Sequence, residues 1–110
     1  LRRDLEAYYK QFGKPIIMFE FGAEGIEGLH SAPALAFSEE YQTEFLKEYS
    51  RVFDELPYVQ GELVWNFADF MTKQGTIRVN GNRKGVFTRE RQPKSAAFYL
   101  KERWKNKNEK

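Results

Sequence analysis

The stretch Pro15-Ile-Ile-Met-Phe-Glu20-Phe-Gly22 is a short apolar run that ends in a carboxylate and is followed at once by glycine. Strands of a parallel sheet are usually covered on both faces, so a continuous apolar run of this length predicts such a strand. We therefore expect residues 16–19 to be buried on both faces and Glu20 to emerge at the carboxyl end. Because α/β folds carry their chemistry at that end, Glu20 is the first candidate functional residue. The plainer alternative is a solvated loop carboxylate.

Three segments carry the pattern of an amphipathic helix. Residues 1–12 repeat apolar side chains at helical spacing, and Gly13 follows where a C-cap glycine belongs. Ser38 precedes two glutamates and is expected to cap a second helix, which ends before Pro57. Pro93 is expected to open the last helix, at a position where its missing N–H costs nothing.

A second strand is predicted between these helices, at residues 58–66. Long loops follow both strands, at 23–37 and 67–86, and long loops after strand ends are often functional. Helices and strands that alternate in this way are typical of the α/β class. No internal repeat or low-complexity linker divides the chain. We therefore treat residues 1–110 as one structural unit.

The composition excludes several classes of protein. Hydrophobic residues make up 41% of the chain and aromatic residues 16%, which is too apolar for a disordered segment. The 18 basic residues are interspersed with 16 acidic ones, so no dense basic face for nucleic acid is expected. Without cysteine and with one histidine, the sequence predicts neither a disulfide nor a metal site. It also contains no transmembrane run.

Four segments together resemble the carboxyl-terminal part of the β-glucuronidases of glycoside hydrolase family 2. In chain order they are residues 19–24, 61–70, 81–85 and 87–97. The resemblance implies about the last two β/α units of a (β/α)8 barrel, since an entire barrel needs about 250 residues. Because the chain also begins within a helical pattern, we expect residues 1–110 to be a C-terminal fragment of a longer catalytic domain.

The resemblance also assigns site residues. Glu20 matches the family's nucleophile, the carboxylate that attacks the sugar in a retaining glycosidase. Asn82 and Lys84 match a motif that binds the carboxylate of glucuronic acid, a task that suits an ammonium beside an amide. Trp65 and Asn66 match residues that floor the sugar site, where an aromatic face stacks on the apolar side of a pyranose.

Other polar residues keep more than one interpretation. Arg78 matches a family arginine that either adds positive charge near the sugar carboxylate or braces Asp69. Glu24 and Glu27 are expected to bond loop backbone or face solvent, because a carboxylate on a flexible loop fixes catalytic geometry poorly. His30 is a possible wall of the pocket.

These assignments predict a retaining β-glucuronidase, which hydrolyses β-D-glucuronides through a covalent glycosyl-enzyme intermediate on Glu20. In the family, the acid/base glutamate lies upstream in an Asn-Glu pair. The only such pair here, Asn108-Glu109, lies in the charged tail, so we expect the chain to be inactive alone. The alternatives are a family 2 glycosidase that acts on galacturonides or neutral β-glycosides, and a non-catalytic carbohydrate-binding or assembly fragment.

The resemblance further implies what accompanies the chain. Expected partners are the β-glucuronide substrate, the remainder of the barrel and the N-terminal β domains, in an enzyme that is commonly a tetramer and needs no cofactor. The segment with Arg89, Arg91 and Lys94 is expected to brace the last helix. The expected location is the bacterial cytoplasm, or the lysosome for an animal protein. Without its partner strands, the fold is expected to be marginal.

Overall fold

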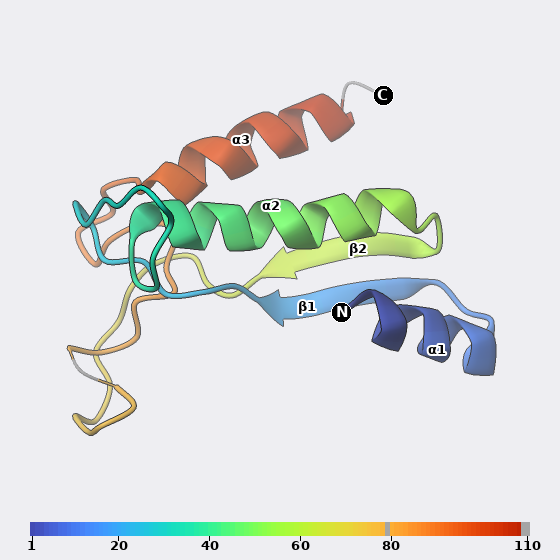
Figure 1. The fold of residues 1–110 in the computed structure, drawn as a ribbon, viewed down its shortest axis with the longest axis horizontal. Coiled ribbons are helices and arrows are strands. Elements are labelled where there is room, and N and C mark those ends of the chain that lie inside the picture. The colour runs from blue at the N-terminus through green and yellow to red at the C-terminus, as the bar shows by residue number, and fades with distance from the viewer. Residues whose placement is uncertain (79, 109–110) are drawn as a thin grey trace.

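The computed structural model describes residues 1–78 and 80–108. Its elements, in chain order, are α1 (Arg2–Phe12), β1 (Ile16–Phe21), α2 (Glu39–Glu55), β2 (Val59–Val64) and α3 (Ser95–Asn108). Figure 1 shows β1 and β2 side by side, with α2 and α3 stacked above them and α1 beside the start of β1. The prediction of an α/β fold with parallel strands is therefore confirmed.

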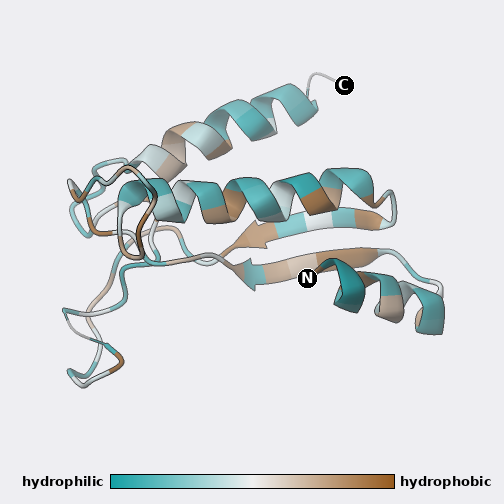
Figure 2. Cartoon of the chain, in the orientation of Figure 1, coloured by the Kyte–Doolittle hydropathy of each residue, from teal (hydrophilic) through white to brown (hydrophobic). Residues whose placement is uncertain are grey.

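The core lies between the sheet and the two long helices. Leu46 and Phe53 of α2, Leu100 of α3 and Phe21 of β1 are all buried in one apolar cluster. The ring of Phe21 meets that of Phe53 edge to face, with centroids 5.2 Å apart. In Figure 2 apolar residues run along most of β1 and lie at both ends of β2, whereas polar residues make up much of each helix. Burial of one sheet face thus holds the layers together.

The opposite face of the sheet corrects one prediction. We expected residues 16–19 to be buried on both faces, but Ile17 is 61% exposed and Phe19 is 64% exposed. Their partners in the parallel register, Gly61 and Leu63, lie on the same uncovered face. The reason is that α2 and α3 cover only one side of the strands. The apolar run is typical of a strand covered on both faces, but in this structure one face stays uncovered.

The helix boundaries confirm two signals and correct a third. Gly13 adopts the left-handed conformation (φ 62°) at the end of α1, and the Ser38 hydroxyl accepts a hydrogen bond from the Tyr41 N–H (3.1 Å). Pro93, however, does not open α3, which begins at Ser95. Pro93 instead forms an antiparallel bridge with Phe87. Because Pro93 pairs with the preceding loop, its backbone stays extended and the helix begins two residues later.

The loops that follow the two strands gather at one end of the molecule. Both strand arrows in Figure 1 point toward this end, where α2 and α3 begin and where part of the 65–94 loop projects from the body. The second strand ends at Val64, slightly earlier than the expected 58–66 segment. Among the helices of the described ranges, none is long and apolar enough to cross a membrane.

Candidate active site

Glu20 lies at a local irregularity near the end of β1. In the register, Phe19 pairs with Leu63 and Phe21 with Val64, so Glu20 is one extra residue inserted between two neighbouring pairs. Its φ of 58° is left-handed, a conformation that costs a residue with a side chain about 1–2 kcal/mol. Bulges of this kind re-aim side chains near active sites, and backbone strain also collects there. The Glu20 side chain is exposed.

Trp65 and Asn66 follow β2 and lie against the end of β1. A Cβ atom added to Gly22 would stand 2.4 Å from the Trp65 carbonyl oxygen, so the two strand ends touch at this point. Trp65 is 39% exposed and meets Phe70 edge to face, and the peptide bond that joins it to Asn66 is cis. Residues 64–70 and Arg91 line a hollow of about 530 Å³ here. An exposed indole over a hollow can receive a sugar ring.

Lys84 lies in a loop that bonds to the strand end next to it. The Asn66 N–H donates to the Lys84 carbonyl (3.2 Å), and the Lys84 N–H donates to Oδ1 of Asn82 (2.9 Å). Asn82 is buried, and the Lys84 side chain is partly exposed. Within the described ranges, the Lys84 ammonium takes part in no ion pair. The structure therefore brings Asn66, Asn82 and Lys84 together.

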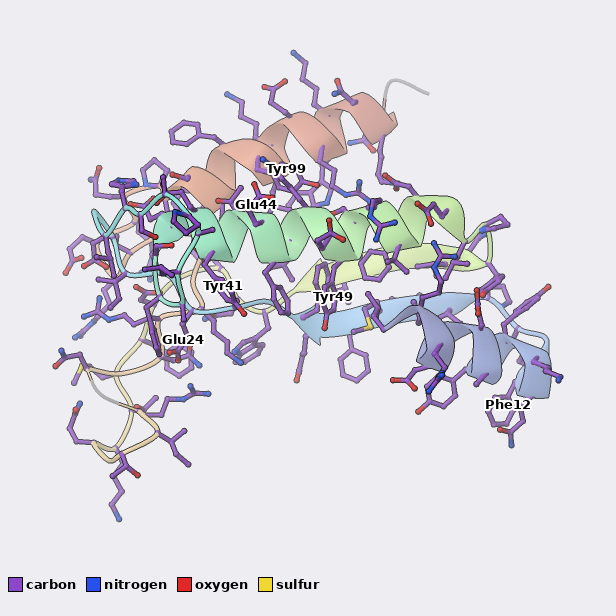
Figure 3. All side chains as sticks on the ribbon, viewed as in Figure 1. Phe12, Glu24, Tyr41, Glu44, Tyr49 and Tyr99 are labelled. Atoms are coloured by element: carbon purple, nitrogen blue, oxygen red, sulfur yellow. The ribbon has the colours of Figure 1, made fainter. Side chains whose placement is uncertain are left out.

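Arg78 makes a contact that the sequence did not suggest. Its guanidinium donates to Oε1 of Glu24 at 2.6 Å, a pair that joins the two long loops. Figure 3 shows Glu24 among the loops, beside the projecting segment. Of the two roles considered for Arg78, bracing Asp69 is wrong, because Lys94 (2.9 Å) and Arg83 (3.6 Å) pair with that carboxylate.

The carboxylates Glu24 and Glu27 were expected to bond loop backbone or to face solvent. Glu27 is exposed, as expected, but each carboxylate also binds an arginine of the second loop: Glu24 binds Arg78, and Glu27 binds Arg83 at 3.1 Å. Four side chains thus form two ion pairs across the loops. These carboxylates serve to hold the loops to each other.

His30 lies at the N-terminus of α2. Its Nδ1 atom is 2.6 Å from Oε2 of Glu40, and its Nε2 atom is 3.6 Å from Glu39. The hydrogen bond to Glu40 raises the pKa of His30 above its usual value. Glu39 itself is buried and accepts hydrogen bonds from the backbone N–H groups of Gly28 and Ser95. This arrangement ties the first loop to the two long helices.

Lys94 braces more than the last helix. Its side chain is fully buried, and its ammonium bonds to Asp69 and to carbonyl groups of both long loops. Gln42 of α2 reaches the same loops. Neither Gln42 nor Asp69 can be recognised as a site residue from the sequence, because a lone amide on a helix and a lone loop aspartate carry no local signal.

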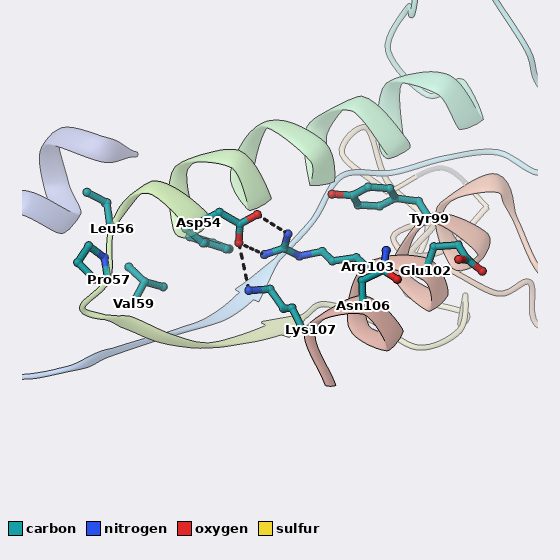
Figure 4. Close-up of a pocket in the computed structure, with 10 residues that line it drawn as sticks. Asp54, Leu56, Pro57, Val59, Tyr99, Glu102, Arg103, Asn106 and Lys107 are labelled. Atoms are coloured by element: carbon teal, nitrogen blue, oxygen red, sulfur yellow. Dashed lines mark hydrogen bonds and ion pairs between the residues drawn. The ribbon is translucent and has the colours of Figure 1, made fainter. Parts of the chain in front are cut away.

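A second, larger hollow of about 750 Å³ lies away from these loops, between the end of α2 and α3. Figure 4 shows Arg103 and Lys107 of α3 reaching Asp54 of α2 inside it. The hydrogen bond from Arg103 lowers the pKa of Asp54 to about 2. Across residues 1–78 and 80–108, no group of three or more His, Cys, Asp or Glu side chains is arranged to hold a metal.

Comparisons with known proteins agree with the fold. The family described as "Glycosyl hydrolases family 2, TIM barrel domain" matches residues 1–108. A β-glucuronidase of Paenibacillus borealis is 58% identical over 101 residues, which are 92% of this chain and 17% of that protein. A solved β-D-glucuronidase for Dictyoglomus thermophilum is 59% identical, with a TM-score of 0.92 over 94% of this chain and 18% of that one.

The β-glucuronidase of Ruminococcus gnavus, solved in complex with D-glucuronic acid, is 51% identical, with a TM-score of 0.89. It is matched by 94% of this chain, which covers 18% of that structure. Matched β-glucuronidases come from bacteria and from mammals. The chain therefore spans only about a sixth of the length of the relatives that it matches.

Proposed function

The chain belongs to the TIM barrel domain of glycosyl hydrolase family 2, and on this basis we propose that it forms the carboxyl-terminal part of the catalytic barrel of a retaining β-glucuronidase. The observation that carries the proposal is the conformation of Glu20. An exposed carboxylate occupies a left-handed bulge position at the end of a strand, one residue before Phe21, whose carbonyl accepts a hydrogen bond from the Trp65 N–H (2.9 Å). Strain of this kind is expected where a side chain must be aimed at a ligand.

Glu20 is the proposed nucleophile. A retaining glycosidase needs two carboxyl groups about 5–5.5 Å apart, one to attack the anomeric carbon and one to act as acid and then base. Glu24 and Glu27 are both engaged with arginines, so neither is offered as the second group. We propose that the second carboxylate comes from the remainder of the barrel, and residues 1–110 alone are then inactive.

In this proposal Lys84 binds the carboxylate of the sugar, and Asn82 lies beside it. Lys84 is a better candidate than Arg78 because the charge of Arg78 is already balanced by Glu24 at 2.6 Å. The side-chain Oδ1 atom of Asn82 accepts a hydrogen bond from the Lys84 N–H (2.9 Å), which holds the backbone that carries the ammonium. Trp65 supplies the apolar surface for the pyranose. Arg78 acts indirectly, by holding the loop through Glu24.

The proposed enzyme includes parts that this chain does not contain. The remaining barrel strands are expected to cover the apolar face with Ile17 and Phe19, and N-terminal β domains and tetramer formation follow the family pattern. The location, bacterial cytoplasm or animal lysosome, stays a prediction that depends on the source of the protein.

Trapping of the covalent intermediate tests the nucleophile. The full-length protein that carries this chain is treated with a 2-fluoro-glucuronide and digested, and mass spectrometry locates the adduct. We expect it on the peptide that contains Glu20, and we expect Glu20→Gln to abolish it while Glu24→Gln retains it. An adduct on another carboxylate, in a protein that cleaves glucuronides, contradicts the assignment.

A second experiment tests the substrate class. Lys84→Ala is compared with Lys73→Ala, which removes an exposed lysine of the projecting loop. We expect only Lys84→Ala to lose activity on glucuronides while any weak activity on neutral glucosides persists. Equal loss on both sugars favours a glycosidase for galacturonides or neutral glycosides. Glycan binding without hydrolysis by the full-length protein favours a non-catalytic module.

A further inference from the structure

Three buried polar side chains converge on the backbone of residues 83–85. Gln42 comes from α2, Asp69 from the loop after β2, and Lys94 from the residue before α3, and each is at most 4% exposed. Together they are called the loop cradle here. Buried polar side chains are costly unless their hydrogen bonds are satisfied, so their convergence on one short loop needs a reason.

Gln42 and Asp69 form hydrogen bonds to the loop from two sides. The Gln42 amide donates to the carbonyl of Gly85 (2.9 Å) and to that of Lys84 (3.4 Å). Oδ1 of Asp69 accepts a hydrogen bond from the Gly85 N–H (2.9 Å). Both carbonyls and one N–H group at residues 84–85 are therefore bonded to side chains from other elements.

Lys94 links this loop to the one that follows Glu20. Its ammonium donates to the Arg83 carbonyl (3.2 Å), to Oδ1 of Asp69 (2.9 Å) and to the Gly25 carbonyl (2.6 Å). The Gly25 N–H in turn donates to the Arg83 carbonyl (2.9 Å). One cation thus fixes the distance between residue 25, five positions after Glu20, and residue 83, which precedes Lys84.

Glycines make this close approach possible. A Cβ atom at Gly85 would stand 2.2 Å from the Asp69 backbone nitrogen, and one at Gly25 would stand 2.5 Å from Oε1 of Gln42. Both glycines are buried. The backbone itself is therefore packed against the cradle, and a small shift of any cradle side chain moves the loop.

The bonds of the cradle are directed mainly at loop backbone. Apolar side chains of similar volume would stabilise this region at least as well, because they avoid the desolvation cost of a buried charge pair. Hydrogen bonds to main-chain groups instead determine where a loop stands. The chain therefore buries Lys94 and Asp69 at a place where the position of the loop matters.

We propose that Gln42, Asp69 and Lys94 are positioning residues, which set where Lys84 stands relative to Glu20 and so determine the preference for an acidic sugar. This inference rests on the proposed function of Lys84. A misplacement of about 1 Å in an active site costs up to about 100-fold in rate, so loosening the cradle is expected to be visible in kinetics.

Gln42→Leu tests the cradle without leaving a buried charge unpaired. In the full-length protein that carries this chain, we expect KM for an aryl β-glucuronide to rise about 10-fold while kcat changes by less than about 3-fold. The ratio of activity on the glucuronide to activity on the matching glucoside should fall about 10-fold. Gln60→Leu is the matched control, because Gln60 is exposed and, within the described part of the chain, its side chain bonds only to the nearby Pro57 carbonyl.

Amide hydrogen exchange of residues 81–87 provides a readout that does not depend on activity. We expect faster exchange in Gln42→Leu than in the wild type and in Gln60→Leu. Lys94→Arg, which keeps the charge, should retain more of the sugar preference than Lys94→Met. The positioning role of the cradle is contradicted if the exchange rate is unchanged. It is also contradicted if the ratio of glucuronide to glucoside activity stays constant while both activities fall with stability.

The two proposals fail in different ways. A wild-type protein that does not distinguish glucuronides from glucosides overturns the proposed function and, with it, the role of the cradle in sugar preference. A wild-type protein that is selective, together with a Gln42→Leu variant that keeps both its KM and its selectivity, overturns the cradle alone.

Discussion

Two charged clusters in this molecule have similar chemistry but different targets. In the loop cradle, Lys94 and Asp69 are buried and bond mainly to main-chain groups of loops. In the second cluster, called the helix seam here, Arg103 binds Glu62 of β2 (2.6 Å) and Asp54 of α2 (2.9 Å), and all the contacts are between side chains. The seam ties regular elements together, whereas the cradle places a loop. We therefore expect changes in the seam to alter stability, and changes in the cradle to alter sugar preference as well.

The largest effect is expected from Gly85→Ala, which breaks the cradle from its backbone side. The new Cβ atom would meet the Asp69 nitrogen at 2.2 Å and the Ala68 carbonyl carbon at 2.4 Å, and neither backbone atom can move easily. We expect a loss of about 3 kcal/mol in the free energy of unfolding, measured by urea titration, together with loss of glucuronide cleavage. Gly75→Ala is the control, because its Cβ atom would meet nothing within 4 Å. Wild-type stability in Gly85→Ala would show that the loop is loosely held.

A smaller effect is expected from Arg103→Met, which opens the helix seam. Glu62, whose side chain is 11% exposed, loses its cationic partner, and Asp54 loses one of two. We expect a cost of about 2 kcal/mol, below the range for a fully buried pair because Asp54 is half exposed. Urea unfolding measures the cost, and the glucuronide-to-glucoside ratio should stay at its wild-type value. A changed ratio would remove the distinction between seam and cradle.

Gly13→Ala provides a milder comparison at the end of the molecule away from the site. Gly13 has a φ of 62°, but a Cβ atom there would meet nothing within 4 Å. Only the conformational penalty of a left-handed alanine remains, about 1 kcal/mol. A fall in the thermal unfolding temperature without any change in KM is expected. A change in KM would mean that the two ends of the molecule are coupled.

The smallest effect concerns pH and the seam. Asp54 has its pKa lowered from 3.8 to about 2 by Arg103, so it binds protons more readily in the unfolded chain. The contribution of Asp54 to the free energy of unfolding is therefore complete above about pH 4 and disappears as the pH falls toward 2. Because the side chain is half exposed, we expect less than about 1 kcal/mol. The difference in unfolding free energy between wild type and Asp54→Asn should shrink over this range, and a constant difference would contradict the prediction.

The sequence predicts those parts of the structure that depend on residues next to each other in the chain. Ser38 and Gly13 mark helix ends because a cap needs only a hydroxyl or a left-handed residue at one position. Pro93 misleads, because its pairing with Phe87 outweighs its preference for a first helical turn. The exposure of Ile17 depends on what covers the sheet, which a strand pattern does not encode.

The contacts of the site are harder to predict because they join distant positions. Arg78 and Glu24 are 54 residues apart, and nothing in either loop identifies the partner. Gln42 is one amide on an amphipathic helix, and its bond to the Gly85 carbonyl is seen only in the folded structure. The resemblance to a family names the residues that are proposed to contact the substrate, but the residues that hold them become visible only in three dimensions.

The bond from Lys94 to the Gly25 carbonyl also has a consequence for the order of folding. This bond joins two positions that are 69 residues apart in the sequence. The helices form from local contacts, and the strands pair across a shorter stretch of chain. Long loops close late because the entropy lost on closure precedes any contact that rewards it. On a ribosome, Lys94 also emerges after the three residues that its ammonium binds, Gly25, Asp69 and Arg83. We therefore expect the sheet and α2 to assemble first and the geometry around Lys84 to be set last, so that sugar selectivity is among the final properties the folding chain acquires.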